Sequence, residues 1–95
     1  MEEPRVLPEI LQAFEQGKTI RVMIKFGTLK GHFIVDSIEP EQKQEQWVFR
    51  GGVFELRTGR YRFYAKEERD DVIAYIFSSN LEKHPRKTII FEVIA

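Results

Sequence analysis

The sequence predicts a small α+β domain in which an N-terminal helix packs on an antiparallel sheet. An apolar stripe with helical spacing comes first, and runs of β-branched and aromatic residues separated by turn residues follow it. The chain has 95 residues, of which 42% are hydrophobic and 32% charged, as is typical of a globular protein. This length supports one modest core, so we expect residues 1–95 to form a single domain.

The helix is predicted over residues 8–16. Pro8 suits a first helical turn and Gly17 suits the position after the last turn. The stripe that faces the core has the spacing i, i+3, i+4, i+7 and consists of Leu7, Ile10, Leu11 and Phe14.

Residues 18–36 carry an ambiguous pattern. Apolar residues alternate with polar ones from Ile20 to Phe26, which favours a strand, yet Val22, Phe26 and Leu29 also fit a helical stripe. The β-branched content favours strands, with Gly27 and Gly31 at turn or bulge positions.

The rest of the chain predicts further strands and loops. The polar segment 39–46 around Pro40 indicates a solvated loop, and the charged segment 66–71 a turn. Residues 72–77 are apolar on both faces, as in a central strand. A basic loop is expected over 81–88, and the apolar tail 89–95 is expected to be a buried strand or short helix.

A β-hairpin is predicted over residues 50–64, around a two-residue loop at Thr58-Gly59. In this pairing Glu55 lies opposite Arg62, while Arg57 lies opposite Arg60. Like charges in direct contact across strands are unfavourable, and a bound anion would remove that penalty. The arrangement therefore indicates phosphate chemistry on the charged face of the hairpin.

Composition excludes several classes of site. The net charge is zero, from 15 basic and 15 acidic residues, which argues against indiscriminate nucleic-acid binding. The chain has no cysteine and only two histidines, far apart in sequence, so we expect no metal or other cofactor. It has no apolar run long enough to span a bilayer. We therefore expect a cytoplasmic protein without membrane contact.

Residues 50–95 resemble the C-terminal half of the RelE/HigB superfamily, the toxins of bacterial type II toxin–antitoxin systems. HigB-like members carry a glycine, then Glu-Leu-Arg, a short turn and Tyr-Arg, followed by an apolar strand and a lysine-rich turn. The matching pieces here are Gly52, Glu55-Leu56-Arg57, Tyr61-Arg62, Val72 to Phe77, Lys83-His84 and Lys87-Thr88. The resemblance implies a small RelE-like fold, with an N-terminal helix or helices packed on an antiparallel sheet.

The same resemblance implies a metal-independent endoribonuclease that cleaves messenger RNA on the ribosome and is neutralised by an antitoxin protein. Arg62 would stabilise the phosphorane-like transition state, with support from Arg57. Glu55 would act as the base or hold Arg62 in place, and His84 would act as an acid or base. The residues expected to bind RNA are Arg60, Tyr64, Lys83, Arg86 and Lys87.

An alternative is a non-catalytic module with an Sm-like or SH3-like small β-barrel behind its N-terminal helix. Such a module would bind a nucleic acid, a nucleotide or a protein, for example as a phage-type inhibitor. Neutral net charge fits this alternative better than it fits a ribosome-bound nuclease. The secondary structure of residues 18–36 distinguishes the two hypotheses. A helix there favours the toxin fold, whereas two strands continuous with the later sheet favour the module.

Overall fold

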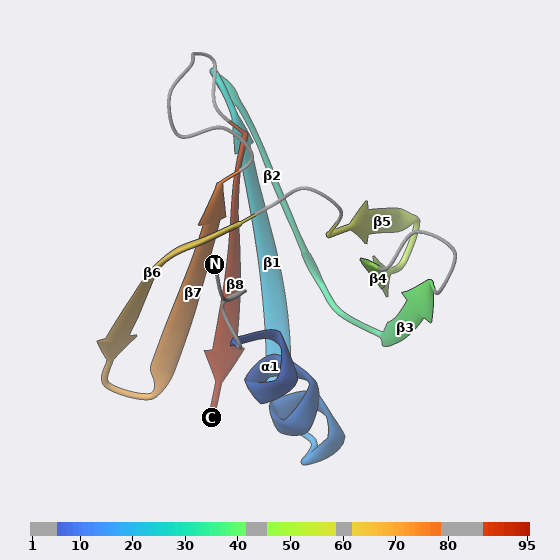
Figure 1. The fold of residues 1–95 in the computed structure, drawn as a ribbon, viewed down its shortest axis with the longest axis vertical. Helices are drawn as coiled ribbons and strands as arrows, with labels where there is room; N and C mark the ends of the chain where they lie inside the picture. The colour runs from blue at the N-terminus through green and yellow to red at the C-terminus, as the bar shows by residue number, and fades with distance from the viewer. Residues whose placement is uncertain (1–5, 42–45, 59–61, 79–86) are drawn as a thin grey trace.

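The computed structural model describes residues 6–41, 46–58, 62–78 and 87–95, and only the main chain of 6, 7, 29 and 62–64. Within these ranges the chain forms one helix and eight strands, arranged in two antiparallel sheets (Figure 1). The predicted α+β class, with an N-terminal helix on antiparallel sheet, is therefore confirmed.

Helix α1 (Val6–Glu15) lies within two residues of its predicted bounds. Gly17 ends it with a φ of 86°, a conformation that glycine adopts without strain. The Gly17 amide donates to the Phe14 carbonyl and the Lys18 amide to the Ala13 carbonyl, which is the Schellman arrangement. Ile10 on the predicted stripe is fully buried.

The five-stranded sheet has the order β2-β1-β8-β7-β6, and all its neighbouring strands are antiparallel. The predicted strands over 18–36 are confirmed, with Gly27 in the turn between them, but Gly31 is not at a turn or bulge, because it pairs regularly with Ile24 inside the second strand. The central position of 72–77 is also confirmed, and the tail forms a central strand. The bounds are β1 Thr19–Phe26, β2 Leu29–Ile34, β6 Arg62–Arg69, β7 Val72–Ser78 and β8 Lys87–Ile94.

Two predicted loops are strands in the structure. Residues 66–69 belong to β6, and the turn is confined to Asp70-Asp71, where Asp70 has a φ of 47°. Residues 39–41 belong to β3 (Ser37–Glu41), whose Pro40 lies opposite Trp47. β3 is an edge strand of the three-stranded sheet, where a residue without an amide proton is tolerated.

The three-stranded sheet has the order β3-β4-β5 and overturns the predicted hairpin. β5 (Phe54–Arg57) pairs with the preceding β4 (Gln46–Gly51), whereas β6 pairs with β7 in the other sheet. The observed register places Glu55 opposite Arg50 instead of Arg62. Opposite charges across strands are favourable, whereas the predicted hairpin would have opposed Arg57 and Arg60.

The core lies between the two sheets, with α1 on the same side of the larger sheet (Figure 1). Phe49 of β4 packs on Phe91 of β8, with ring centroids 4.7 Å apart. β2 continues through Val35 and Asp36 into β3, so one stretch of chain passes between the sheets. The described strands do not close into a barrel, so the predicted Sm-like or SH3-like closure is wrong.

Candidate functional site

The predicted catalytic residues do not form one described site. Glu55 and Arg57 lie on β5, whereas Arg62 lies on β6 in the other sheet, where its main chain pairs with Ser78. Tyr64 is also on β6, at a register shift between Phe63 and Ala65. Lys87 begins β8. The side chains of Arg62 and Tyr64 lie outside the described part of the structure, as do the whole residues Arg60, Lys83, His84 and Arg86.

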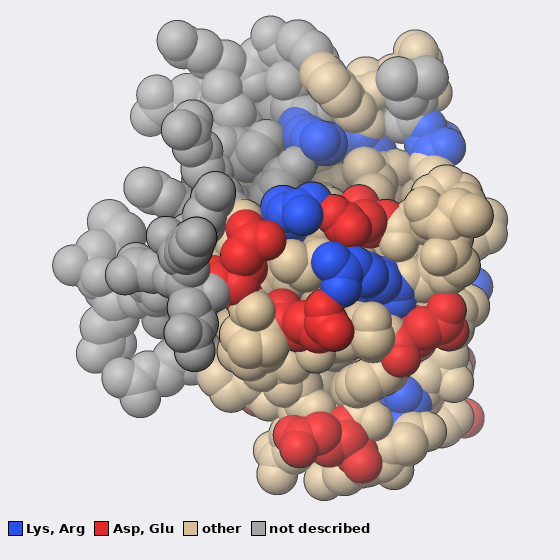
Figure 2. Space-filling model, turned by 90° about the vertical axis from the view of Figure 1, so that its right-hand side faces the viewer, with Lys and Arg blue, Asp and Glu red and all other residues tan. Residues whose placement is uncertain are grey.

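Glu55 and Arg57 belong to a network of ion pairs on the outer face of the three-stranded sheet (Figure 2). Arg50 pairs with Glu39 on β3 and, at 3.2 Å, with Glu55 on β5. Arg57 pairs with Glu55 and, at 3.4 Å, with Glu41. The network joins all three strands, and blue and red side chains accordingly alternate at the centre of Figure 2.

The sheet register explains why these charges meet. Side chains at alternate positions point to the same face, so Glu39 and Glu41 share a face with Arg50 and with Glu55. Val48 lies opposite both Glu39 and Arg57 in the middle of this face and is only 3% exposed. The charged side chains therefore cover an apolar centre.

The electrostatics of this network disfavour catalysis by Glu55. Its hydrogen bond from Arg50, and then that from Arg57, lower the pKa of the Glu55 carboxyl, which makes it a weaker base. The pKa of Arg50 is raised, chiefly by the hydrogen bond to Glu55. Two guanidinium groups here face three carboxylates, so an incoming phosphate would meet net negative charge.

Sequence reasoning missed Arg50, Glu39 and Glu41 as members of this network. The sequence predicts a loop for the two glutamates because Pro40 stands between them. Their spacing of two residues was the signal, since it places both carboxylates on one face of a strand. This spacing is informative only if the segment around Pro40 is recognised as an edge strand, where proline is tolerated.

A second feature is an apolar patch at the β4–β5 turn, which we call the turn patch and define as Val53 and Phe54. Val53 is 94% exposed and Phe54 56% exposed. The ring of Phe54 stacks on Phe33 at the margin of the core, with centroids 5.8 Å apart. The sequence does not predict this patch, because the alternation of apolar and polar residues along a strand does not show where the core ends.

The backbone around the turn patch is tightly held. Gly52, with a φ of 59°, opens the two-residue turn and donates its amide proton to a carboxylate oxygen of Asp36 at 2.9 Å. Asp36 in turn donates its amide proton to the Arg50 carbonyl. Ile34, which is 49% exposed, lies close by, because its carbonyl oxygen packs against Gly51. The turn is therefore anchored to the end of β2.

Within the described ranges, no cluster of three or more histidine, aspartate or glutamate side chains is arranged to hold a metal ion. The described helix is too short and too polar to cross a membrane.

The chain matches no protein-family model, no curated protein and no solved structure.

Proposed function

We propose that this chain is a non-catalytic protein-binding module that contacts its partner through the turn patch. The exposure of Val53 and Phe54 at a two-residue turn is the observation that carries the proposal. The turn consists of Gly52 and Val53, and such turns are usually built from glycine, asparagine, aspartate or serine, so the exposed valine at its second position calls for an explanation. Exposed apolar groups clustered on a soluble domain mark interaction surfaces.

The turn patch is also preorganised for binding. Phe54 is already stacked on Phe33 and the turn is anchored through Asp36, so little conformational freedom remains to be lost on association. Full burial of a valine or phenylalanine side chain contributes roughly 1.5–3 kcal/mol. The neighbouring Arg50 and Glu55 supply a polar rim around the apolar centre.

Residues 18–36 form two strands instead of the helix expected for the toxin fold, which supports a binding module even though the described strands do not close into a barrel. The nuclease activity and the relationship to the RelE/HigB superfamily stay predictions. The engagement of Glu55 and Arg57 by other charged side chains gives the nuclease hypothesis no support from the described residues.

Site-specific photo-crosslinking tests the proposal. A photoreactive phenylalanine analogue at position 53 in the source cells is expected to give a discrete cross-linked protein product. The same analogue at Lys18, which is exposed beyond the end of α1, is the control and is expected to give none. Equal products from both positions, or none from position 53, would contradict the proposal.

Controlled expression in a bacterium tests the rival hypothesis. A module without nuclease activity is expected to leave messenger RNA intact, and Arg57→Ala and Arg62→Ala are then expected to change nothing. Degradation of messenger RNA that either substitution abolishes would overturn the non-catalytic assignment.

A further inference from the structure

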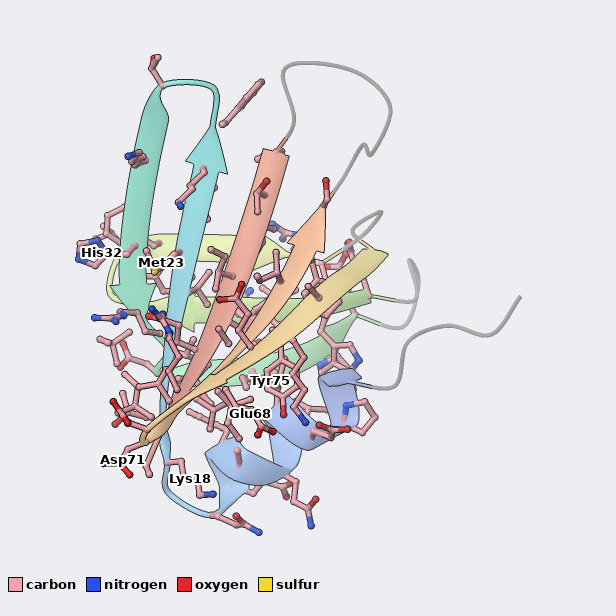
Figure 3. The ribbon with its side chains drawn as sticks, turned by 90° about the vertical axis from the view of Figure 1, so that its left-hand side faces the viewer. Lys18, Met23, His32, Glu68, Asp71 and Tyr75 are labelled. Carbon is pink, nitrogen blue, oxygen red and sulfur yellow. The ribbon has the colours of Figure 1, made fainter. Side chains whose placement is uncertain are left out.

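One whole face of the five-stranded sheet is free of any described element. α1 and the three-stranded sheet both lie on the other side of it, as Figures 1 and 3 show. Tyr75, for example, contacts Glu9 of α1 from that inner side. We call the opposite side the open face. Met23 and His32, on neighbouring strands β1 and β2, lie together on it (Figure 3).

The strand register arranges the open face in rows that run across the strands. The central row is uncharged over four strands, and its large members Met23, Ile90 and Ile76 are half-buried. The next row on that face, towards the β1–β2 turn, begins with Lys30 and Lys25 and continues through Thr88 and Ser78. A basic row therefore borders an apolar one.

Lys25 and Lys30 lie directly opposite each other, and both are exposed. Like charges in this position destabilise a sheet, and neither ammonium group has a carboxylate within salt-bridge distance among the described residues. Arg21 on the same face differs, because its guanidinium is bound to Glu92 at 2.6 Å. Within the described residues, no carboxylate compensates this pair of neighbouring lysines on the open face.

We propose that the open face binds an amphipathic acidic segment of a partner protein. The carboxylates of such a segment would compensate Lys25 and Lys30, and its apolar side would cover Met23, Ile76 and Ile90. This inference rests on the proposed function, because it assumes a protein partner, and it adds the chemistry by which that partner is recognised.

Two other occupants fit less well. The described side chains of the open face include no phenylalanine, tyrosine or tryptophan on which the bases of single-stranded nucleic acid could stack. A second copy of the chain would bring together two surfaces of the same sign. Among the described residues, the charged side chains of the face are the basic Arg21, Lys25, Lys30 and Arg69 and the acidic Glu67 and Glu92.

Two synthetic helical peptides of about 18 residues, or five turns, test the inference. They share a leucine and alanine stripe, and the polar side carries glutamate in one and lysine in the other. The readout is the methyl NMR spectrum of the protein. The acidic peptide is expected to shift the signals of Met23, Ile76 and Ile90 and to leave the core residue Ile20 unchanged.

Charge reversal provides the control. Lys25→Glu with Lys30→Glu is expected to weaken binding of the acidic peptide by about tenfold or more and to favour the basic peptide. Lys18→Glu, at an exposed lysine beyond the end of α1, is expected to leave both affinities unchanged. Thermal unfolding of each variant confirms that it is folded.

The inference is overturned if both peptides bind equally, if neither binds, or if an oligouridylate of about 12 nucleotides shifts the same methyl signals more strongly. Val53→Ser separates this inference from the proposed function, because it alters the turn patch alone. With the photoreactive analogue placed at position 54, this substitution is expected to reduce cross-linking through the turn patch and to leave peptide binding to the open face intact.

Discussion

The hydroxyl of Tyr75 on β7 donates a hydrogen bond of 2.8 Å to Oε2 of Glu9 on α1. It joins the only described helix to a central strand of the larger sheet. Burial, and after it the bond to Glu9, raise the pKa of Tyr75 to about 12; the bond contributes because only the protonated hydroxyl can donate to a carboxylate.

This relationship predicts a loss of stability in alkali. A tyrosine whose folded pKa exceeds its unfolded value stabilises the fold fully below the unfolded pKa, near 10, and progressively less as pH rises towards about 12. The difference corresponds to at most roughly 2–3 kcal/mol, of which solvent near the hydroxyl screens a part. Urea unfolding of the parent and of Tyr75→Phe between these pH values measures it. The parent is expected to lose more stability than the variant, and parallel curves would refute the assignment.

A second prediction concerns Arg21 and Glu92. Glu92 is only 6% exposed on the open face, and Arg21 neutralises it at 2.6 Å. Arg21→Met leaves the carboxylate without its partner and is expected to cost about 2 kcal/mol of unfolding free energy, less than for a fully buried pair because Arg21 is 41% exposed. Adding Glu92→Met is expected to recover most of the loss; denaturant unfolding of both variants checks this.

Gly51 is predicted to tolerate no side chain. A Cβ at this position would meet the carbonyl oxygen of Ile34 and would lie 2.6 Å from Cδ2 of Phe33. Gly51→Ala is therefore expected to destabilise the protein by about 3 kcal/mol, because the junction between the two sheets would have to move apart. Gly31→Ala is the matched control, since nothing lies within 4 Å of its Cβ position. Similar melting temperatures for the two variants would contradict the close approach.

The two residues of the turn patch are expected to differ in their effect on stability. Val53→Ser removes a side chain that is 94% exposed, so the free energy of unfolding should stay within about 0.5 kcal/mol of the parent. Phe54→Ala also removes the stack on Phe33 and is expected to cost about 1 kcal/mol. A large loss in Val53→Ser would mean that the patch is structural, which thermal unfolding can decide.

Local patterns predicted much of the fold. The helix over 8–16 and the strands over 18–36 and 72–77 follow from apolar spacing, β-branched content and glycine positions, all of which act within one element. The Pro40 segment was misassigned because its strand pairs only on one side. The candidate site was predicted less well, since Glu55 and Arg57 were recognised as charged neighbours but their partners Arg50, Glu39 and Glu41 were not.

The amino-acid sequence by itself determined where most strands lie and which of their residues are apolar, because alternation is a property of the strand alone. Only the tertiary structure decided which strands pair. β5 could form a tight turn with either neighbour in the chain, and it pairs with β4, where Arg50 meets Glu55. That choice turns a presumed phosphate site into a network of ion pairs. It also leaves Val53 and Phe54 exposed at the turn, because the turn lies beyond the edge of the core that the two sheets enclose.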